Sequence, residues 1–314
     1  MRKIDLITGF LGAGKTTLLI KYVRQLLADG IKTAVVVNDH GAVNVDMVLL
    51  RQALGSSVGL EMVLGDGDPG CHKRRLRAKL IALAMESWER VVVEPSGVFE
   101  AEEFFDLLHE EPLDRFYELG SVMAVIDSRP MAESAASARY LLAEQVKDAG
   151  AVVMSKSQLA SLKERRQAVA AVNSALSQFR CGRVLRYGEV LHKSWDKLTR
   201  GDLRRLREAG RQFWDMERPA LGEDYMTFTY LNTGLRAEKL LAWAPEIFSR
   251  PEIYGSVTRI KGSVRRGDGQ WQQLNLTAGE QTSEETALGQ DCIIVIGRQL
   301  DRQALDGLLG RSLK

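Results

Sequence analysis

Short apolar runs alternate with amphipathic stretches along the first two thirds of the chain. Runs rich in Val, Ile and Leu predict strands at residues 4–8, 33–38, 60–64, 90–94, 121–127, 151–155 and 183–186. Between them, apolar residues with helical spacing predict helices at residues 15–27, 74–86, 101–108, 138–149 and 158–178. Several strands are continuous apolar runs, as expected for a parallel sheet that is buried on both faces. The alternation therefore predicts an α/β fold with a doubly wound, mostly parallel sheet.

The pattern changes towards the C-terminus. Residues 210–224 lack periodicity and contain Pro219 and Gly222, so they are interpreted as a linker. Beyond it, the sequence predicts a strand at 226–231, a helix at 237–248, two strands joined by a turn at 266–269, a strand at 292–297 and a helix at 301–309. We therefore expect a first domain at residues 1–209, a linker at 210–224 and a smaller C-terminal α+β domain at 225–314.

Composition and charge narrow the class of protein. The chain has 314 residues, 45% of them hydrophobic, which suits about two globular domains. Its net charge of +2 creates no global field that would attract nucleic acid, and no apolar run approaches the length of a membrane span. A predicted strand begins within four residues of the N-terminus, which leaves no room for a signal peptide. With its three cysteines far apart, the chain is expected to be soluble, cytoplasmic and without a disulfide scaffold, and to have no nucleic-acid or membrane partner.

A glycine-rich motif at residues 9–17, GFLGAGKTT, lies between the first predicted strand and the first predicted helix. It fits the P-loop pattern G-x-x-x-x-G-K-[ST] in the strand–loop–helix setting that this motif requires. Glycine permits positive φ and close approach to phosphates, Lys15 supplies a charge to the β- and γ-phosphates, and the Thr16 hydroxyl suits Mg²⁺. The predicted phosphate-binding residues are Gly9, Gly12, Ala13, Gly14, Lys15, Thr16 and Thr17.

Residues at the ends of later strands are candidates for the rest of the site. In a doubly wound sheet, ligands bind where the carboxyl ends of the strands meet. Glu94 ends a predicted strand and is expected to hold Mg²⁺ directly or through water, while Gly97 presents a backbone N–H to the γ-phosphate. The alternative interpretation is a strand-capping turn with an incidental glutamate.

Several segments together carry a resemblance to one family. They are TGFLGAGKTTLL at 8–19, NDHG at 38–41, EPSG at 94–97, EQV at 144–146, SK at 155–156, RIKG at 259–262 and IGRQLD at 296–301. They cover nearly the whole chain and resemble the CobW-like family of P-loop GTPases, which is grouped with GTPases that mature nickel enzymes. The resemblance implies a GTP-hydrolysing domain that couples its nucleotide state to delivery of a metal or a metal-containing cofactor.

Two carboxylates acquire roles from this resemblance. Asp39 follows the second predicted strand, where the family usually has glutamate, and would join the Mg²⁺ site in the first switch region. Asp46 matches a family carboxylate that orients the attacking water or binds a metal; a solvated residue at a helix start is the alternative. The catalytic set is thus Lys15, Thr16, Asp46 and Glu94, and the Mg²⁺ ligands are Thr16, Asp39 and Glu94.

The residues expected at the nucleotide base depart from the family pattern. The family has [NTS]-K-x-D where this chain has Ser155, Lys156, Ser157 and Gln158. Lys156 can pack along the base, but Gln158 replaces the aspartate that accepts two hydrogen bonds from guanine, and a neutral acceptor forms weaker bonds. GTP, with GDP as its product, is the expected nucleotide, and ATP is the alternative.

The family's metal motif is largely missing from residues 66–71, DGDPGC. The family commonly reads N-G-C-x-C-C there, whereas this chain keeps only Cys71, which His72 follows. A three-cysteine zinc site is therefore excluded. In one interpretation Cys71 and His72, with Asp66 and Asp68, form a harder mixed-ligand site for Zn, Co or Ni; in the other this is a switch loop without metal.

Two other sequence features receive structural interpretations. The basic run at 72–79 is interpreted as the solvated face of a helix that buries Leu76, Leu80 and Leu83. The tryptophans at positions 195, 214, 243 and 271 are interpreted as core or domain-interface residues.

Taken with the resemblance, the residues predict a nucleoside-triphosphate hydrolase, a P-loop GTPase that uses Mg²⁺ and acts on a client metalloprotein or corrinoid-type protein. No arginine finger is identifiable in the sequence, so slow intrinsic turnover is expected, with a partner or the second copy of a homodimer as the source of one. The alternatives are a nucleotide-dependent switch without metal cargo and an ATP-dependent enzyme.

Overall fold

The computed structural model describes residues 1–39, 45–64, 69–129, 136–219, 225–286, 289 and 291–310. These residues form two compact units, one built mainly from residues 1–221 and the other mainly from residues 222–314. None of the described helices is both long enough and apolar enough to cross a membrane.

The first unit contains a seven-stranded sheet with the order β3-β2-β4-β1-β5-β6-β7. Its strands are β1 (Arg2–Thr8), β2 (Thr33–Asp39), β3 (Gly59–Leu64), β4 (Arg90–Glu94), β5 (Tyr117–Asp127), β6 (Ala151–Ser155) and β7 (Val190–Leu191). Across the sheet from β2 to β7, each strand pairs in parallel with its neighbour. The strands β2, β3 and β4 lie on one side of β1, and β5, β6 and β7 lie on the other side. The loop after β1 is therefore at the topological switch point of the sheet.

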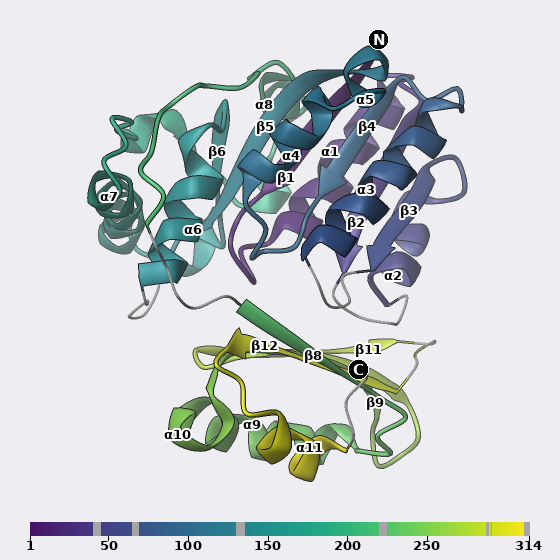
Figure 1. The fold of residues 1–314 in the computed structure, drawn as a ribbon, viewed down its shortest axis with the longest axis vertical. Helices are drawn as coiled ribbons and strands as arrows, with labels where there is room; N and C mark the ends of the chain where they lie inside the picture. Colours follow the sequence, from purple (N-terminus) through teal and green to yellow (C-terminus); the bar gives the residue numbers. More distant parts are fainter. Residues whose placement is uncertain are drawn as a thin grey trace. The chain divides into compact units, whose positions relative to one another are not determined.

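Helices lie on both faces of this sheet, which confirms the predicted doubly wound α/β fold. They are α1 (Lys15–Ala28), α2 (Val45–Leu54), α3 (Pro69–Ala84), α4 (Ala101–His109), α5 (Leu113–Phe116), α6 (Ala136–Lys147), α7 (Leu162–Gln178) and α8 (Arg200–Arg207). Figure 1 shows α3, α4 and α6 in front of the sheet and α1 behind it. All five residues of β4 are buried, as the continuous apolar run predicts.

The two faces of the sheet are packed differently. Ile4 and Leu6 of β1 belong to the core cluster that includes the apolar residues of α3, α4 and α6. Leu76, Leu80 and Leu83 of α3 are buried in the same cluster, so the predicted apolar stripe beneath the basic run is confirmed.

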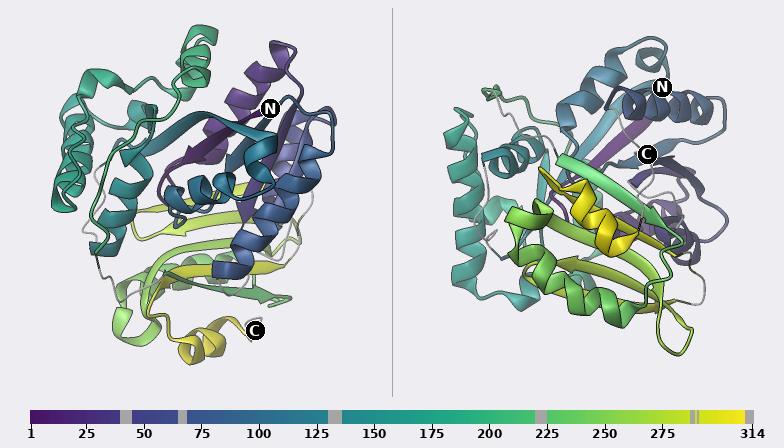
Figure 2. Two further views of the ribbon diagram at one scale, coloured as in Figure 1. Left: turned by 45° about the horizontal axis from the view of Figure 1, so that its top comes forward. Right: turned by 60° about the horizontal axis from the view of Figure 1, so that its bottom comes forward.

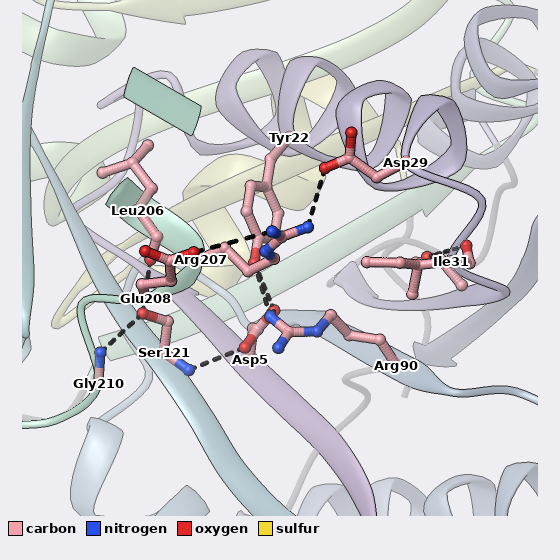
Figure 3. A network of polar contacts seen from close by, with 11 residues as sticks. Asp5, Tyr22, Asp29, Ile31, Arg90, Ser121, Leu206, Arg207, Glu208 and Gly210 are labelled. Atoms are coloured by element: carbon pink, nitrogen blue, oxygen red, sulfur yellow. Dashed lines mark hydrogen bonds and ion pairs between the residues drawn. The ribbon is translucent and has the colours of Figure 1, made fainter. Parts of the chain in front are cut away.

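The other face carries a buried polar network that Figure 3 shows from close by. Asp5 of β1 accepts hydrogen bonds from the Tyr22 hydroxyl of α1 at 2.7 Å, from Arg90 of β4 at 2.8 Å and from the Ser121 N–H of β5 at 2.8 Å. The Ser121 hydroxyl donates to the Leu206 carbonyl oxygen in α8 at 2.6 Å. Three strands and two helices are therefore joined through one carboxylate and its neighbours.

Several predicted elements of this unit differ from the structure. The helix α3 begins at Pro69 rather than at residue 74, and the strand β5 begins at Tyr117 rather than at residue 121. Two other differences have a visible cause in side-chain hydrogen bonds. Residues 183–186 form no strand, because the Leu185 backbone is occupied by the side chain of Asn173 from α7. The Leu185 N–H donates to Asn173 Oδ1 at 2.8 Å, and Asn173 Nδ2 donates to the Leu185 carbonyl oxygen at 2.9 Å. The helix predicted from residue 158 begins at Leu162, since Ser161 and Glu164 form a capping box there.

The second unit is an antiparallel five-stranded sheet covered by helices, as the predicted α+β pattern requires. Its strands are β8 (Tyr225–Leu231), β9 (Ser256–Arg265), β10 (Trp271–Thr277), β11 (Glu280–Thr286) and β12 (Cys292–Arg298), in the order β11-β10-β9-β12-β8. The helices are α9 (Ala237–Ser249), α10 (Pro251–Tyr254) and α11 (Arg302–Leu309). The right view of Figure 2 shows α9 and α11 on the same face of the sheet, and their apolar residues share one core with β8, β9, β10 and β12.

The predicted turn between β9 and β10 is confirmed, with Gly269 at a φ of 87°. The edge strand β11 was not predicted, because its sequence EQTSEET has no apolar alternation.

Candidate functional site

The P-loop backbone requires glycine at three positions. Gly9, Gly12 and Gly14 have φ angles of 143°, 77° and 93°, a region that other residues rarely adopt. Gly9 also lies directly against β5, because a Cβ atom built on it would be 2.3 Å from the Val125 carbonyl oxygen. The loop is therefore fixed both by its own conformation and by the neighbouring strand.

Lys15, the first residue of α1, turns its side chain back over this loop. Its Nζ donates to the Gly9 carbonyl oxygen at 2.9 Å and to the Phe10 carbonyl oxygen at 3.4 Å. The residue is only 7% exposed. A buried positive charge thus lies against the loop that the motif assigns to phosphate groups, beside the N-terminus of a 14-residue helix.

Thr16 and Glu94 are brought together from distant parts of the sequence. The Thr16 hydroxyl donates to Glu94 Oε1 at 2.8 Å, and Glu94, at the end of β4, is 8% exposed. A hydroxyl and a carboxylate are the hard oxygen ligands that Mg²⁺ prefers, so this pair fits such an ion.

The segment after β4 lies directly against the P-loop. A Cβ atom built on Gly97 would be 2.5 Å from the Leu11 backbone nitrogen, so only glycine fits there. Gln145 of α6 holds this segment, because its buried Nε2 donates to the carbonyl oxygens of Gly97 at 3.0 Å and Phe99 at 3.2 Å. Any change in the position of Gly97 must therefore break or carry along the contact with α6.

Glu144 fixes the next part of the same segment, where α4 begins. Its two carboxyl oxygens accept from the Ala101 N–H at 2.8 Å and the Glu102 N–H at 2.9 Å. Burial raises the pKa of Glu144 to about 8, since the two backbone N–H groups that favour the ionised form offset the burial only in part. The roles of Glu144 and Gln145 are visible only in the structure, because the sequence shows no pattern that links them to residues 97–102.

The base-recognition segment, residues 155–158, which are predicted to contact the nucleotide base, lies at the end of β6. Lys156 adopts a left-handed conformation with a φ of 53°, and its Nζ lies 2.9 Å from Asp127 Oδ2 at the end of β5. Burial by itself would raise the pKa of Asp127, but the hydrogen bonds from Arg129 and Lys156 outweigh this effect, so the pKa of Asp127 is lowered. Gln158 lies in a one-turn 3-10 helix (Ser157–Leu159) with an exposed side chain.

Several other predicted site residues have side chains that lie outside the described part of the structure. Asp39 ends β2, Asp46 lies at the start of α2 and Cys71 lies at the start of α3, but their side chains are outside the described part of the structure, as are Asp66 and Asp68. His72 is half-buried in α3. Among the side chains that are described, no group of three or more His, Cys, Asp or Glu is placed to hold a metal ion. The roles assigned to these residues therefore stay predictions.

The sequence matches the model of a known protein family and is similar to known proteins. The sequence model of the CobW/HypB/UreG nucleotide-binding domain matches residues 3–182. The zinc chaperone YeiR of Escherichia coli is 27% identical over 174 residues, which are 50% of this chain and 47% of YeiR. The zinc-regulated GTPase metalloprotein activator 1 of Dictyostelium discoideum is 30% identical over 162 residues, which are 46% of this chain and 33% of that protein. The chain thus spans less than half the length of either relative.

Solved structures align over more of the chain but less closely. The Zn(II)-bound YjiA GTPase of E. coli aligns with 98% of both chains at 15% identity and a TM-score of 0.33. A superposition this loose carries no argument about residues or ligands.

Proposed function

The chain belongs to the CobW/HypB/UreG family of P-loop GTPases, and we propose that it hydrolyses GTP to deliver a metal to, or to activate, a client metalloprotein. The observation that carries the proposal is the contact between Thr16 and Glu94, 2.8 Å apart beside Lys15 and the P-loop. The two relatives, a zinc chaperone and a zinc-regulated GTPase metalloprotein activator, favour zinc as the cargo.

Several residues would share the phosphoryl transfer to water. Lys15 neutralises charge on the β- and γ-phosphates, the loop N–H groups bind the same oxygens, and Gly97 donates its backbone N–H to the γ-phosphate. Thr16 and Glu94, with Asp39, would hold Mg²⁺, which when bound withdraws charge from the β–γ bridge. Asp46 would orient the attacking water. Slow turnover is expected without an added arginine.

The link from Gly97 to α6 supports a switch that responds to the γ-phosphate. Gly97 lies against Leu11 of the P-loop, and its carbonyl oxygen accepts from Gln145. Movement of Gly97 on loss of the γ-phosphate would therefore reach α6 and the start of α4, where a client protein can sense it.

A nucleotide-dependent switch without metal cargo is the second candidate. It is favoured by the sequence, which keeps only Cys71 of the family's thiolate cluster. Titration of Zn²⁺, Co²⁺ and Ni²⁺ into wild type, Cys71→Ala and Cys181→Ala separates the two candidates. Cys181 is a buried free cysteine and serves as the control. Metal binding that Cys71→Ala abolishes and Cys181→Ala preserves supports delivery; a wild type that binds none of the three ions refutes it.

Hydrolysis is tested by phosphate release from GTP and from ATP in the presence of Mg²⁺. Lys15→Ala should abolish release while the circular dichroism spectrum stays that of wild type. Undiminished turnover in this variant would refute the assigned site, and tighter binding of ATP than of GTP would refute the GTPase.

A further inference from the structure

The ring of Trp195 lies beside the P-loop. Trp195 begins a one-turn 3-10 helix (Trp195–Lys197) that follows β7. A Cβ atom built on Gly14, the last loop residue before α1, would be 3.6 Å from Cζ2 of Trp195 and 3.4 Å from Cβ of Ser155. Trp195 is half-buried, so part of the residue stays accessible to solvent.

The order of strands places Trp195 towards the base end of the nucleotide. From the centre of the sheet to its edge, the strands run β1, β5, β6 and β7. The P-loop follows β1, the base-recognition segment follows β6, and Trp195 follows β7. A nucleotide with phosphates at β1 and its base towards β6 would thus meet the Trp195 ring with its base and ribose.

The segment that carries Trp195 is anchored on both sides. Before it, Val190 of β7 pairs with Val152 of β6. After it, Arg200 of α8 forms an ion pair at 2.5 Å with Asp29, which follows the end of α1. The backbone of this segment is therefore anchored on both sides of Trp195, and an anchored segment has less conformational entropy to lose when a ligand binds.

The polar recognition of the base is weak in this chain. Gln158 is neutral and exposed, and the Asp127 carboxylate already pairs with Lys156. Among the described residues, the indole N–H of Trp195 donates no hydrogen bond, whereas those of Trp88 and Trp214 donate to Glu86 and Gln212. The Trp195 ring has both an apolar surface and a polar group available to a ligand.

We propose that Trp195 forms one wall of the base-and-ribose site and binds the purine base by stacking, so that stacking replaces part of the lost carboxylate contact. The inference rests on the proposed function, because it presumes that the P-loop binds a purine nucleotide. Stacking on an aromatic side chain tolerates different bases, since every base has a π-face. The chain should therefore discriminate little between GTP and ATP.

The test compares a ligand that has a base with one that has none. Calorimetric titrations with GTP and with inorganic tripolyphosphate, both with Mg²⁺, are done on wild type, Trp195→Ala, Trp195→Phe and the control Trp214→Phe. Trp195→Ala should weaken the binding of GTP about five- to hundredfold and leave the affinity for tripolyphosphate unchanged. Trp195→Phe should recover most of the GTP affinity, and Trp214→Phe should match wild type.

Each other outcome overturns a defined part of the reasoning. If Trp195→Ala binds GTP as tightly as wild type does, or loses the same factor in affinity for GTP and for tripolyphosphate, Trp195 does not contact the base. It then does no more than support the P-loop. If wild type binds tripolyphosphate but GTP no more tightly, no base site exists, and the inference fails while the phosphate site stands. If wild type binds neither ligand, the proposed function fails and the inference with it.

Discussion

Replacing Glu144 with glutamine should remove a pH dependence of stability that the buried carboxyl group gives to this protein. Glu144 is 1% exposed, and its two oxygens accept from the N–H groups of Ala101 and Glu102 at the start of α4. Burial raises the pKa of Glu144 from 4.5 to about 8. The native state therefore binds one proton more than the unfolded chain between these two pH values.

The sign and size follow from this difference. An acid whose pKa is raised on folding stabilises the native state in its protonated form, so this stability is complete below pH 4.5 and is lost as the pH rises through 8. Each pH unit within the window costs about 1.4 kcal/mol. Wild type should thus lose roughly 3 kcal/mol in the free energy of unfolding between pH 6 and pH 9 through Glu144 alone.

Glutamine at position 144 has no titrating proton and only one acceptor oxygen. One of the two N–H groups that now bind Glu144 would lose its acceptor, so the variant should be about 1–2 kcal/mol less stable than wild type at pH 6. At pH 9 the difference should disappear or reverse, because only wild type has lost the contribution of a protonated carboxyl group.

Urea denaturation at pH 6, 7, 8 and 9 measures both the pH dependence of the wild-type free energy of unfolding and its difference from that of Glu144→Gln. Glu164→Gln is the matched control, since Glu164 is exposed and hydrogen bonds with Ser161 lower its pKa, which places its titration below this range. Its stability curve should run parallel to that of wild type. A difference between wild type and Glu144→Gln that stays constant from pH 6 to pH 9 would refute the buried titration.

Four further substitutions, one of them a matched control, test the site and its support. Gly9→Ala should abolish nucleotide binding, because its Cβ would lie 2.3 Å from a β5 carbonyl oxygen, whereas Gly12→Ala meets nothing within 4 Å and should cost only about 1 kcal/mol of stability by thermal melting. Glu94→Gln should bind GTP but lose most Mg²⁺-dependent hydrolysis in a phosphate-release assay; full activity would exclude Glu94 from the metal site. Asn173→Leu should cost about 2 kcal/mol, because two backbone groups of Leu185 lose their partners. Faster amide exchange at Leu185 would show the loss, and unchanged exchange would contradict it.

The sequence predicts the elements that bury a regular apolar pattern. The strands 90–94 and 151–155 match β4 and β6, because their Val-rich runs are buried on both faces of a parallel sheet. The strand β11 is different: it lies at the edge of its sheet and is mostly exposed, so its polar sequence carries no periodic signal.

Features that depend on tertiary contacts were beyond prediction from sequence. Residues 183–186 have the composition of a strand, but the side chain of Asn173 occupies the hydrogen-bonding groups of Leu185. The P-loop was recognisable because its backbone conformation requires glycines at fixed spacing. Gln145 belongs to a segment that contributed to the family resemblance, but its role could not be predicted, since its amide meets Gly97 only after α6 has packed against the segment that follows β4.

The hydrogen bonds of Lys15 have a consequence for how fast a nucleotide can be captured and released. The ammonium donates to the carbonyl oxygens of Gly9 and Phe10 and so ties the first turn of the helix to the start of the loop. An arriving phosphate can share this cation by a small shift of one flexible side chain, without refolding of the loop. The loop itself is therefore expected to add little to the kinetic barrier for capture or release of a phosphate group.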